Sequence, residues 1–201
     1  NKMKDRFELN VSGAKVLAID PDTQVFRHLL FEEVEPTISQ VLAEVGPTIV
    51  LDHAPALMTA AARKFAGEFI EQPLYAFIED GHLPADAKPG RGQSNIVINP
   101  GKELLAGYKN SELMISGPNF FLGGKRYSLN EFDLVFTAPS PGDPSMTDLI
   151  ILCNSPHRLE AMARRLGHYG KYSYLIFPVG QGSPVKGNWQ LSDSPLVVKS
   201  H

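Results

Sequence analysis

The stretch from residue 148 to residue 178 constrains the fold of this chain most strongly. It holds two apolar runs, Leu149–Cys153 and Tyr174–Phe177, which have the length of buried strands. Between these runs, apolar residues recur at positions i, i+3, i+4 and i+7, the spacing of one face of a helix. These residues are Leu159, Met162, Ala163 and Leu166. A strand, a helix and a second strand in succession predict a βαβ unit and therefore a parallel sheet.

The residues at the ends of this helix support the same interpretation. Ser155 is expected to cap the N-terminus with its side chain, and Pro156 suits the first helical position, where no backbone hydrogen bond is lost. Gly167 follows the last apolar position and is expected to end the helix in a left-handed conformation.

The rest of the chain repeats the alternation of strands and helices. Apolar runs at 48–51 and 74–78 are predicted strands, and helices are predicted to begin near Pro36 and Pro55. The segment 113–137 differs, because short apolar runs with Gly123-Gly124 between two of them are typical of antiparallel hairpins. The predicted fold is therefore a three-layer α/β fold, with a mostly parallel sheet flanked by helices and an antiparallel extension from 113 to 137.

Length and charge limit the domain organisation and the partners. We expect one α/β domain over residues 14–201, with residues 1–13 forming either an edge strand or the tail of a preceding β-domain. The formal net charge of −3 gives no basic footprint, so nucleic acid is not an expected partner. No apolar run approaches the roughly 18 residues of a membrane span. The chain begins at Asn1 without an initiator Met, so we expect a longer parent protein.

Polar residues at the ends of the predicted strands are the candidate ligand-binding residues. Ligands of open α/β sheets sit outside the carboxyl ends of the strands. The candidates at these ends are Asp20, Asp22, Asp52, His53, Asn154 and Ser155. Asp, Asn and Ser also favour turns and helix caps, so the same residues have a structural explanation.

The sequence contains no catalytic signature. The His-Glu-x-x-His motif of zinc peptidases and the Gly-x-Ser-x-Gly motif of serine hydrolases are absent, and the single cysteine, Cys153, is predicted to be buried in a strand. We therefore predict no catalytic residue, no metal ligand and no cofactor.

A polar aromatic run between the helix and the strand after it is the candidate partner-binding segment. It contains His168, Tyr169, Lys171 and Tyr172, and we group Trp189 with it. Aromatic residues of this kind either anchor a fold, with their hydroxyl groups bonded to backbone, or contact a partner.

Three segments of the chain resemble the region downstream of the catalytic domain in bacterial gluzincin-type zinc-aminopeptidase-like proteins. They are Asp20-Pro21-Asp22 with Val25-Phe26-Arg27, then 166–174, then 186–196. The resemblance implies an accessory domain of a larger protein that is extracytoplasmic or attached to a membrane. It carries over no catalytic residue and no zinc ligand.

Two functions are consistent with these observations. The first is a non-catalytic accessory or binding domain that docks against an upstream peptidase-like domain of the same chain, in which case this chain alone is not an enzyme. The alternative is a small-molecule hydrolase or ligand-binding enzyme that uses Asp20, Asp52 and His53. An enzyme requires at least two of these groups to converge in one cleft.

Overall fold

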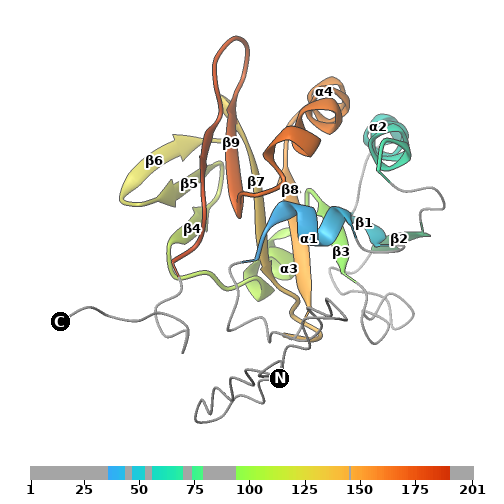
Figure 1. Cartoon of the computed structure of the whole chain (residues 1–201), viewed down its shortest axis with the longest axis horizontal. Helices are drawn as coiled ribbons and strands as arrows, with labels where there is room; N and C mark the ends of the chain where they lie inside the picture. The colour runs from blue at the N-terminus through green and yellow to red at the C-terminus, as the bar shows by residue number, and fades with distance from the viewer. Residues whose placement is uncertain are drawn as a thin grey trace, which may run out of the picture. The chain divides into compact units, whose positions relative to one another are not determined.

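The computed structural model of the chain describes residues 36–43, 47–52, 56–69, 74–78, 94–144 and 146–190 (Figure 1). Within this part of the chain, Pro36–Trp189 form one compact unit. Residues 1–13, for which a tail or an edge strand is predicted, lie outside the described residues. Among the described helices, none combines the length and the apolar character that crossing a membrane requires.

A seven-stranded sheet forms the centre of this unit, in the order β10-β9-β7-β8-β3-β1-β2. Its strands are β1 (Thr48–Asp52), β2 (Leu74–Ile78), β3 (Asn95–Ile98), β7 (Phe132–Pro139), β8 (Thr147–Leu152), β9 (Tyr174–Pro178) and β10 (Val185–Gly187). The pairs β2–β1, β1–β3 and β3–β8 are parallel, whereas β8–β7, β7–β9 and β9–β10 are antiparallel. The predicted α/β class is confirmed, and the sheet is mixed.

The predicted βαβ unit consists of β8, α4 (Pro156–Leu166) and β9, but its two strands are not neighbours. Strand β7 lies between them and pairs antiparallel with both, so β8 and β9 run in the same direction. A short loop is enough to join an antiparallel pair, whereas a parallel pair needs a long crossover. The local connection explains why β7 pairs with β8, and β9 then pairs with the other edge of β7, so β7 lies inside the unit that the sequence predicts to be continuous.

The two ends of α4 differ from the sequence prediction in the side-chain cap at Ser155 and in the backbone conformation of Gly167. Pro156 occupies the first turn as predicted, and Ser155 is the N-cap residue with an extended backbone, but its side chain makes no capping hydrogen bond. Gly167 has a φ of −56°, so the predicted left-handed stop is wrong. The chain continues instead into a tighter 3₁₀ turn, Gly167–Tyr169, which carries it toward β9.

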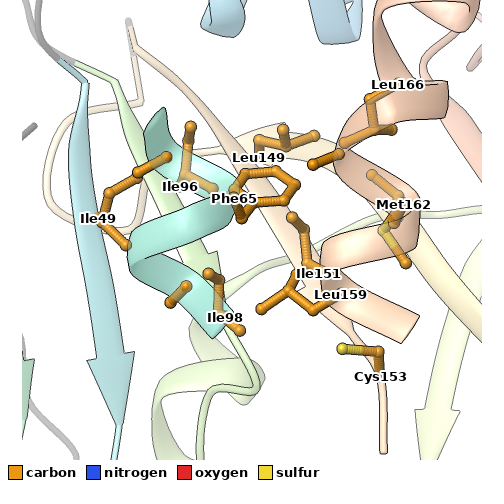
Figure 2. Packing of buried hydrophobic residues seen from close by; sticks show 14 of the residues in the cluster. Ile49, Phe65, Ile96, Ile98, Leu149, Ile151, Cys153, Leu159, Met162 and Leu166 are labelled. Atoms are coloured by element: carbon orange, nitrogen blue, oxygen red, sulfur yellow. The ribbon is translucent and has the colours of Figure 1, made fainter. Parts of the chain in front are cut away.

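Helices cover one face of the sheet, which we call the helical face. They are α1 (Ile38–Leu42), α2 (Ala56–Gly67) and α4. The predicted apolar stripe of α4 is fully buried there. Figure 2 shows Phe65 of α2 between the sheet residues Ile96 and Leu149 and the α4 residue Leu159. A buried aromatic ring at this position joins both helices to the sheet.

The opposite face of the sheet, the second face, packs against a small antiparallel sheet and a short helix. The small sheet contains β4 (Leu113–Ser116), β5 (Asn119–Leu122) and β6 (Lys125–Ser128), and the helix is α3 (Lys102–Gly107). Gly123 and Gly124 form the β5–β6 turn with φ angles of 56° and 77°, as the hairpin signal predicts. The predicted antiparallel pairing is confirmed, but β4–β6 form a separate sheet and only β7 joins the large one.

Candidate functional site

The carboxyl ends of β1 and β3 form the topological switch point of the large sheet. From β1 the chain continues to β2 on one side, and β3 then pairs with β1 on the other side. Ligands of open α/β sheets bind at such a point, because the connections diverge and leave a crevice. The residues at this edge are Asp52, Asn99 and, at the end of the neighbouring β8, Cys153.

Asp52 ends β1 and is buried at the beginning of α3. Its Oδ2 atom accepts a hydrogen bond of 2.5 Å from the backbone N–H of Gly101, the N-cap residue of that helix. A Cβ atom on Gly101 would lie 2.6 Å from the same oxygen, so the close approach requires glycine. A carboxylate at a helix N-terminus is favourable for the helix dipole. The contact therefore gives Asp52 a structural role, and its role in ligand binding stays a prediction.

Asn99 joins the ends of β3 and β8 through its side chain. Its Nδ2 donates to the carbonyl oxygen of Cys153 and its Oδ1 accepts from the backbone N–H of Cys153, both at 2.8 Å. Asn99 itself has a φ of 50°, a left-handed conformation that asparagine tolerates better than most residues. The side-chain amide thus continues the parallel ladder one step beyond the last backbone pair, Ile98 with Ile151.

The turn after β8 holds the remaining candidates of this edge. Asn154 is exposed, and its Nδ2 donates a hydrogen bond of 2.7 Å to the carbonyl oxygen of Leu129. Cys153 is buried as predicted, and burial, reinforced by the charge of Asp133, raises the pKa of its thiol to about 12. The thiol is therefore protonated at neutral pH and is a poor nucleophile.

A buried ion pair lies at the same end of the sheet and was not predicted from the sequence. Oδ1 of Asp133, at the beginning of β7, is 3.0 Å from Nη2 of Arg158 in the first turns of α4, and the Asp133 side chain is only 5% exposed. Burial is the largest influence and raises the pKa of Asp133 to about 6, although Arg158 and the backbone N–H of Asn154 favour the charged form. A cavity of about 110 Å³ adjoins the pair, with Met162 in its wall.

The described candidate residues at the carboxyl edge bond to different parts of the fold and not to one another. Asp52 bonds to the start of α3 and Asn154 to the turn after β6, while Ser155 is a helix N-cap. Asp20, Asp22 and His53 lie outside the described residues. Within the described ranges, no three His, Cys, Asp or Glu side chains are grouped as a metal site would require.

A second buried polar cluster lies at the opposite, amino-terminal edge of β3 and β8. Oδ1 of Asp148 accepts from the backbone N–H and Nδ2 of Asn95, and Oδ2 accepts from the hydroxyl group of Tyr108, at 2.8 to 2.9 Å. Burial raises the pKa of Asp148 in spite of these bonds, and burial together with the nearby carboxylate raises the pKa of Tyr108. The cluster attaches α3 to the sheet, because Tyr108 is the C-cap residue of α3.

The predicted partner-binding segment forms a surface of aromatic rings and lysines on the helical face. The rings of Tyr169 and Tyr172 are half-buried, with centroids 6.4 Å apart. Nζ of Lys186 lies 5.3 Å and 5.2 Å from these two centroids, and Nζ of Lys171 lies 5.3 Å from that of Tyr172. We call Tyr169, Lys171, Tyr172 and Lys186 the lysine–tyrosine surface.

Two other predicted members of this segment have different places. His168 is exposed in the 3₁₀ turn beside Tyr169. Trp189 is buried in the cluster on the second face. Its Nε1 donates a hydrogen bond of 2.8 Å to the carbonyl oxygen of Thr137, and the centroid of its ring lies 4.7 Å from that of Tyr174. Trp189 therefore does not pack with Tyr169 and Tyr172, and Lys186 contacts them instead.

The chain was compared with models of known protein families and with curated proteins, and neither comparison gives a match.

Proposed function

We propose that this chain is a non-catalytic accessory domain that docks against an upstream peptidase-like domain of the same protein. The observation that carries the proposal is the lysine–tyrosine surface. Its four residues come from the turn after α4 and from β10, and they bring two exposed ammonium groups onto two half-buried rings. Tyrosine, an aromatic residue with a polar tip, is enriched at protein interfaces, and it is the two rings that favour an interface here.

The carboxyl edge of the sheet supports the same proposal. Its described polar groups are engaged with backbone atoms: Asn99 bonds Cys153, Asp52 bonds Gly101, and Asn154 bonds Leu129. Groups bonded in this way explain the strand ends as structural elements, without a reacting substrate. The resemblance to the accessory region of zinc-aminopeptidase-like proteins adds the identity of the partner and an extracytoplasmic or membrane-attached bacterial parent.

The proposed domain has three layers and a mostly parallel sheet. Strands β2, β1, β3 and β8 are linked by parallel pairs, and β9 shares their direction because both β8 and β9 are antiparallel to β7. Helices α1, α2 and α4 would form the first layer, and α3 with the small sheet would form the third.

A binding measurement between separately produced domains tests the proposal. The domain encoded upstream of this chain would be titrated with the chain in a calorimeter, and we expect saturable binding. Tyr172→Ala, which removes a ring of the surface, should weaken binding at least ten-fold. Lys125→Gln is the matched control, since Lys125 lies 5.1 Å from the ring of Tyr127 on the small sheet, outside the surface. An absence of binding by the unmodified chain would refute the docking function.

A further inference from the structure

We propose that the lysine–tyrosine surface binds an acidic polypeptide segment, whose carboxylates pair with Lys171 and Lys186. This inference rests on the proposed docking function and specifies the chemistry of the partner at that surface. Three observations support it: the cations lie over aromatic rings, no described carboxylate pairs with them, and the register of β10 places Lys186 beside the two tyrosines.

The cations of this surface are held in place by rings. Lys186 lies over both tyrosines, and Arg165 extends the group, because its guanidinium carbon is 4.7 Å from the centroid of Phe177. The ring of Phe177 in turn meets Tyr169 nearly edge-on, with centroids 6.1 Å apart. A cation over a ring is attracted by the π-electrons but keeps its full charge. Three positive charges therefore surround one group of rings.

No carboxylate balances these charges in the part of the chain that the structure describes. Lys64 pairs with Glu160 and Arg158 with Asp133, whereas Lys171, Lys186 and Arg165 lie over rings and form no ion pair with the described residues. The chain as a whole carries a net charge of −3, so this local excess of positive charge is not a consequence of a basic composition. Unbalanced cations that are already positioned favour association with an anionic partner.

The register of β10 explains why Lys186 belongs to this surface. Lys186 is opposite Leu175 of β9, and Leu175 lies in the cluster of the helical face. Directly opposed residues of an antiparallel pair lie on the same face of the sheet. Lys186 therefore lies on the same face as α4, which leads into the turn that carries Tyr169 and Tyr172. Strand β10 is also the edge of the sheet, so a partner can approach it.

The geometry favours a protein segment over nucleic acid or a membrane. Single-stranded nucleic acid stacks its bases on open aromatic faces, but here lysine ammonium groups lie over both tyrosine rings. A membrane surface is bound by basic residues together with apolar side chains that enter the lipid, whereas both rings are half-buried against the core. Carboxylates of a peptide can pair with each lysine and leave the rings in place.

The test uses a hexaglutamate peptide as the probe and the full chain labelled with ¹⁵N for NMR. We expect shift changes confined to residues 165–172 and 185–187, and weaker binding in 500 mM NaCl than in 25 mM NaCl because salt screens exposed charges. The double variant Lys171→Gln/Lys186→Gln should bind at least ten-fold more weakly. Lys125→Gln should bind like the parent, because its lysine lies over a tyrosine ring outside the surface.

Three results would overturn the inference: no binding of the peptide, binding that the double variant retains, or stronger binding to vesicles containing phosphatidylserine than to the peptide. Failure of the inference is distinguishable from failure of the docking function. If the upstream domain binds the double variant as well as the parent, docking holds and the acidic-segment inference fails. If the peptide binds at the surface but the upstream domain does not bind, the inference holds and the docking function fails.

Discussion

Replacing Asn99 with alanine should destabilise the domain by about 3 kcal/mol. The substitution removes two hydrogen bonds of 2.8 Å to the backbone of Cys153, each worth about 1 kcal/mol net. It also places alanine at a φ of 50°, where a Cβ atom adds about 1 kcal/mol of strain relative to a residue that tolerates the left-handed region. The three contributions are independent to first order, because two belong to the side-chain amide and one to the backbone.

Urea unfolding of the full chain, followed by circular dichroism, measures this loss directly. A loss of about 3 kcal/mol corresponds to a fall in Tm of roughly 6 to 12 °C for a chain of this size. Asn99→Gly removes the same two bonds but accepts the positive φ, so it should be no less stable than Asn99→Ala. An alanine variant that loses less than 1 kcal/mol would refute the role of Asn99 in joining β3 to β8. A glycine variant clearly less stable than the alanine variant would refute the contribution of backbone strain.

Three further predictions concern buried groups and one close backbone contact. Tyr108→Phe removes a 2.9 Å bond to the Asp148 carboxylate and should cost about 2 kcal/mol in urea unfolding, and a cost below 0.5 kcal/mol would contradict it. The pKa of Asp133 is about 6 in the folded chain, above its unfolded value, so the stability it contributes is full below about pH 4. This contribution is lost progressively as the pH rises through 6, by about 3 kcal/mol in all. Asp133→Asn should flatten this part of the profile of unfolding free energy against pH, and an unchanged slope would show that other groups cause it. Gly170→Ala brings a Cβ atom to 2.9 Å from Ser39 of α1 and should lower the free energy of unfolding by about 1 to 3 kcal/mol. Gly167→Ala is the control, because the space around Gly167 is open and the substitution should not destabilise the domain. Equal effects of the two substitutions would exclude the packing explanation.

Local periodicity was enough to predict most individual elements. The four stripe positions of α4 are all buried, because a helix of that spacing must present them on one side. The turn at Gly123-Gly124 likewise follows from the two positive φ angles that a tight hairpin requires. Helix α3 was not predicted, because its six residues contain only one buried apolar side chain and are too few to show a helical period.

The order of the strands could not be predicted, because it depends on pairings between distant residues. Phe136 of β7 pairs with Ile150 on one side and with Tyr174 on the other. Each of these runs is apolar enough for a central strand, so composition does not decide which strand lies in the middle. The insertion of β7 between β8 and β9 is therefore a property of the assembled sheet.

The buried polar clusters escaped prediction for a related reason. Asp148 lies next to Asn95 only because β3 and β8 are parallel neighbours, and their positions differ by 53 residues in the chain. The sequence gives one usable signal, which is that each residue stands near the start of an apolar run. A polar residue at the start of a strand is also a common turn residue, so the signal does not identify the pair.

Strand register also explains why the predicted aromatic group divides between two faces. Along β9, Leu175 and Phe177 lie in the cluster of the helical face, whereas Tyr174 and Ile176 lie in the cluster of the second face. Trp189 packs on Tyr174 and so belongs to the second face. Lys186, opposite Leu175, joins the tyrosines of the helical face. A shift of β10 by one residue would exchange these faces, and the lysine–tyrosine surface would lose the cation that lies over both of its rings.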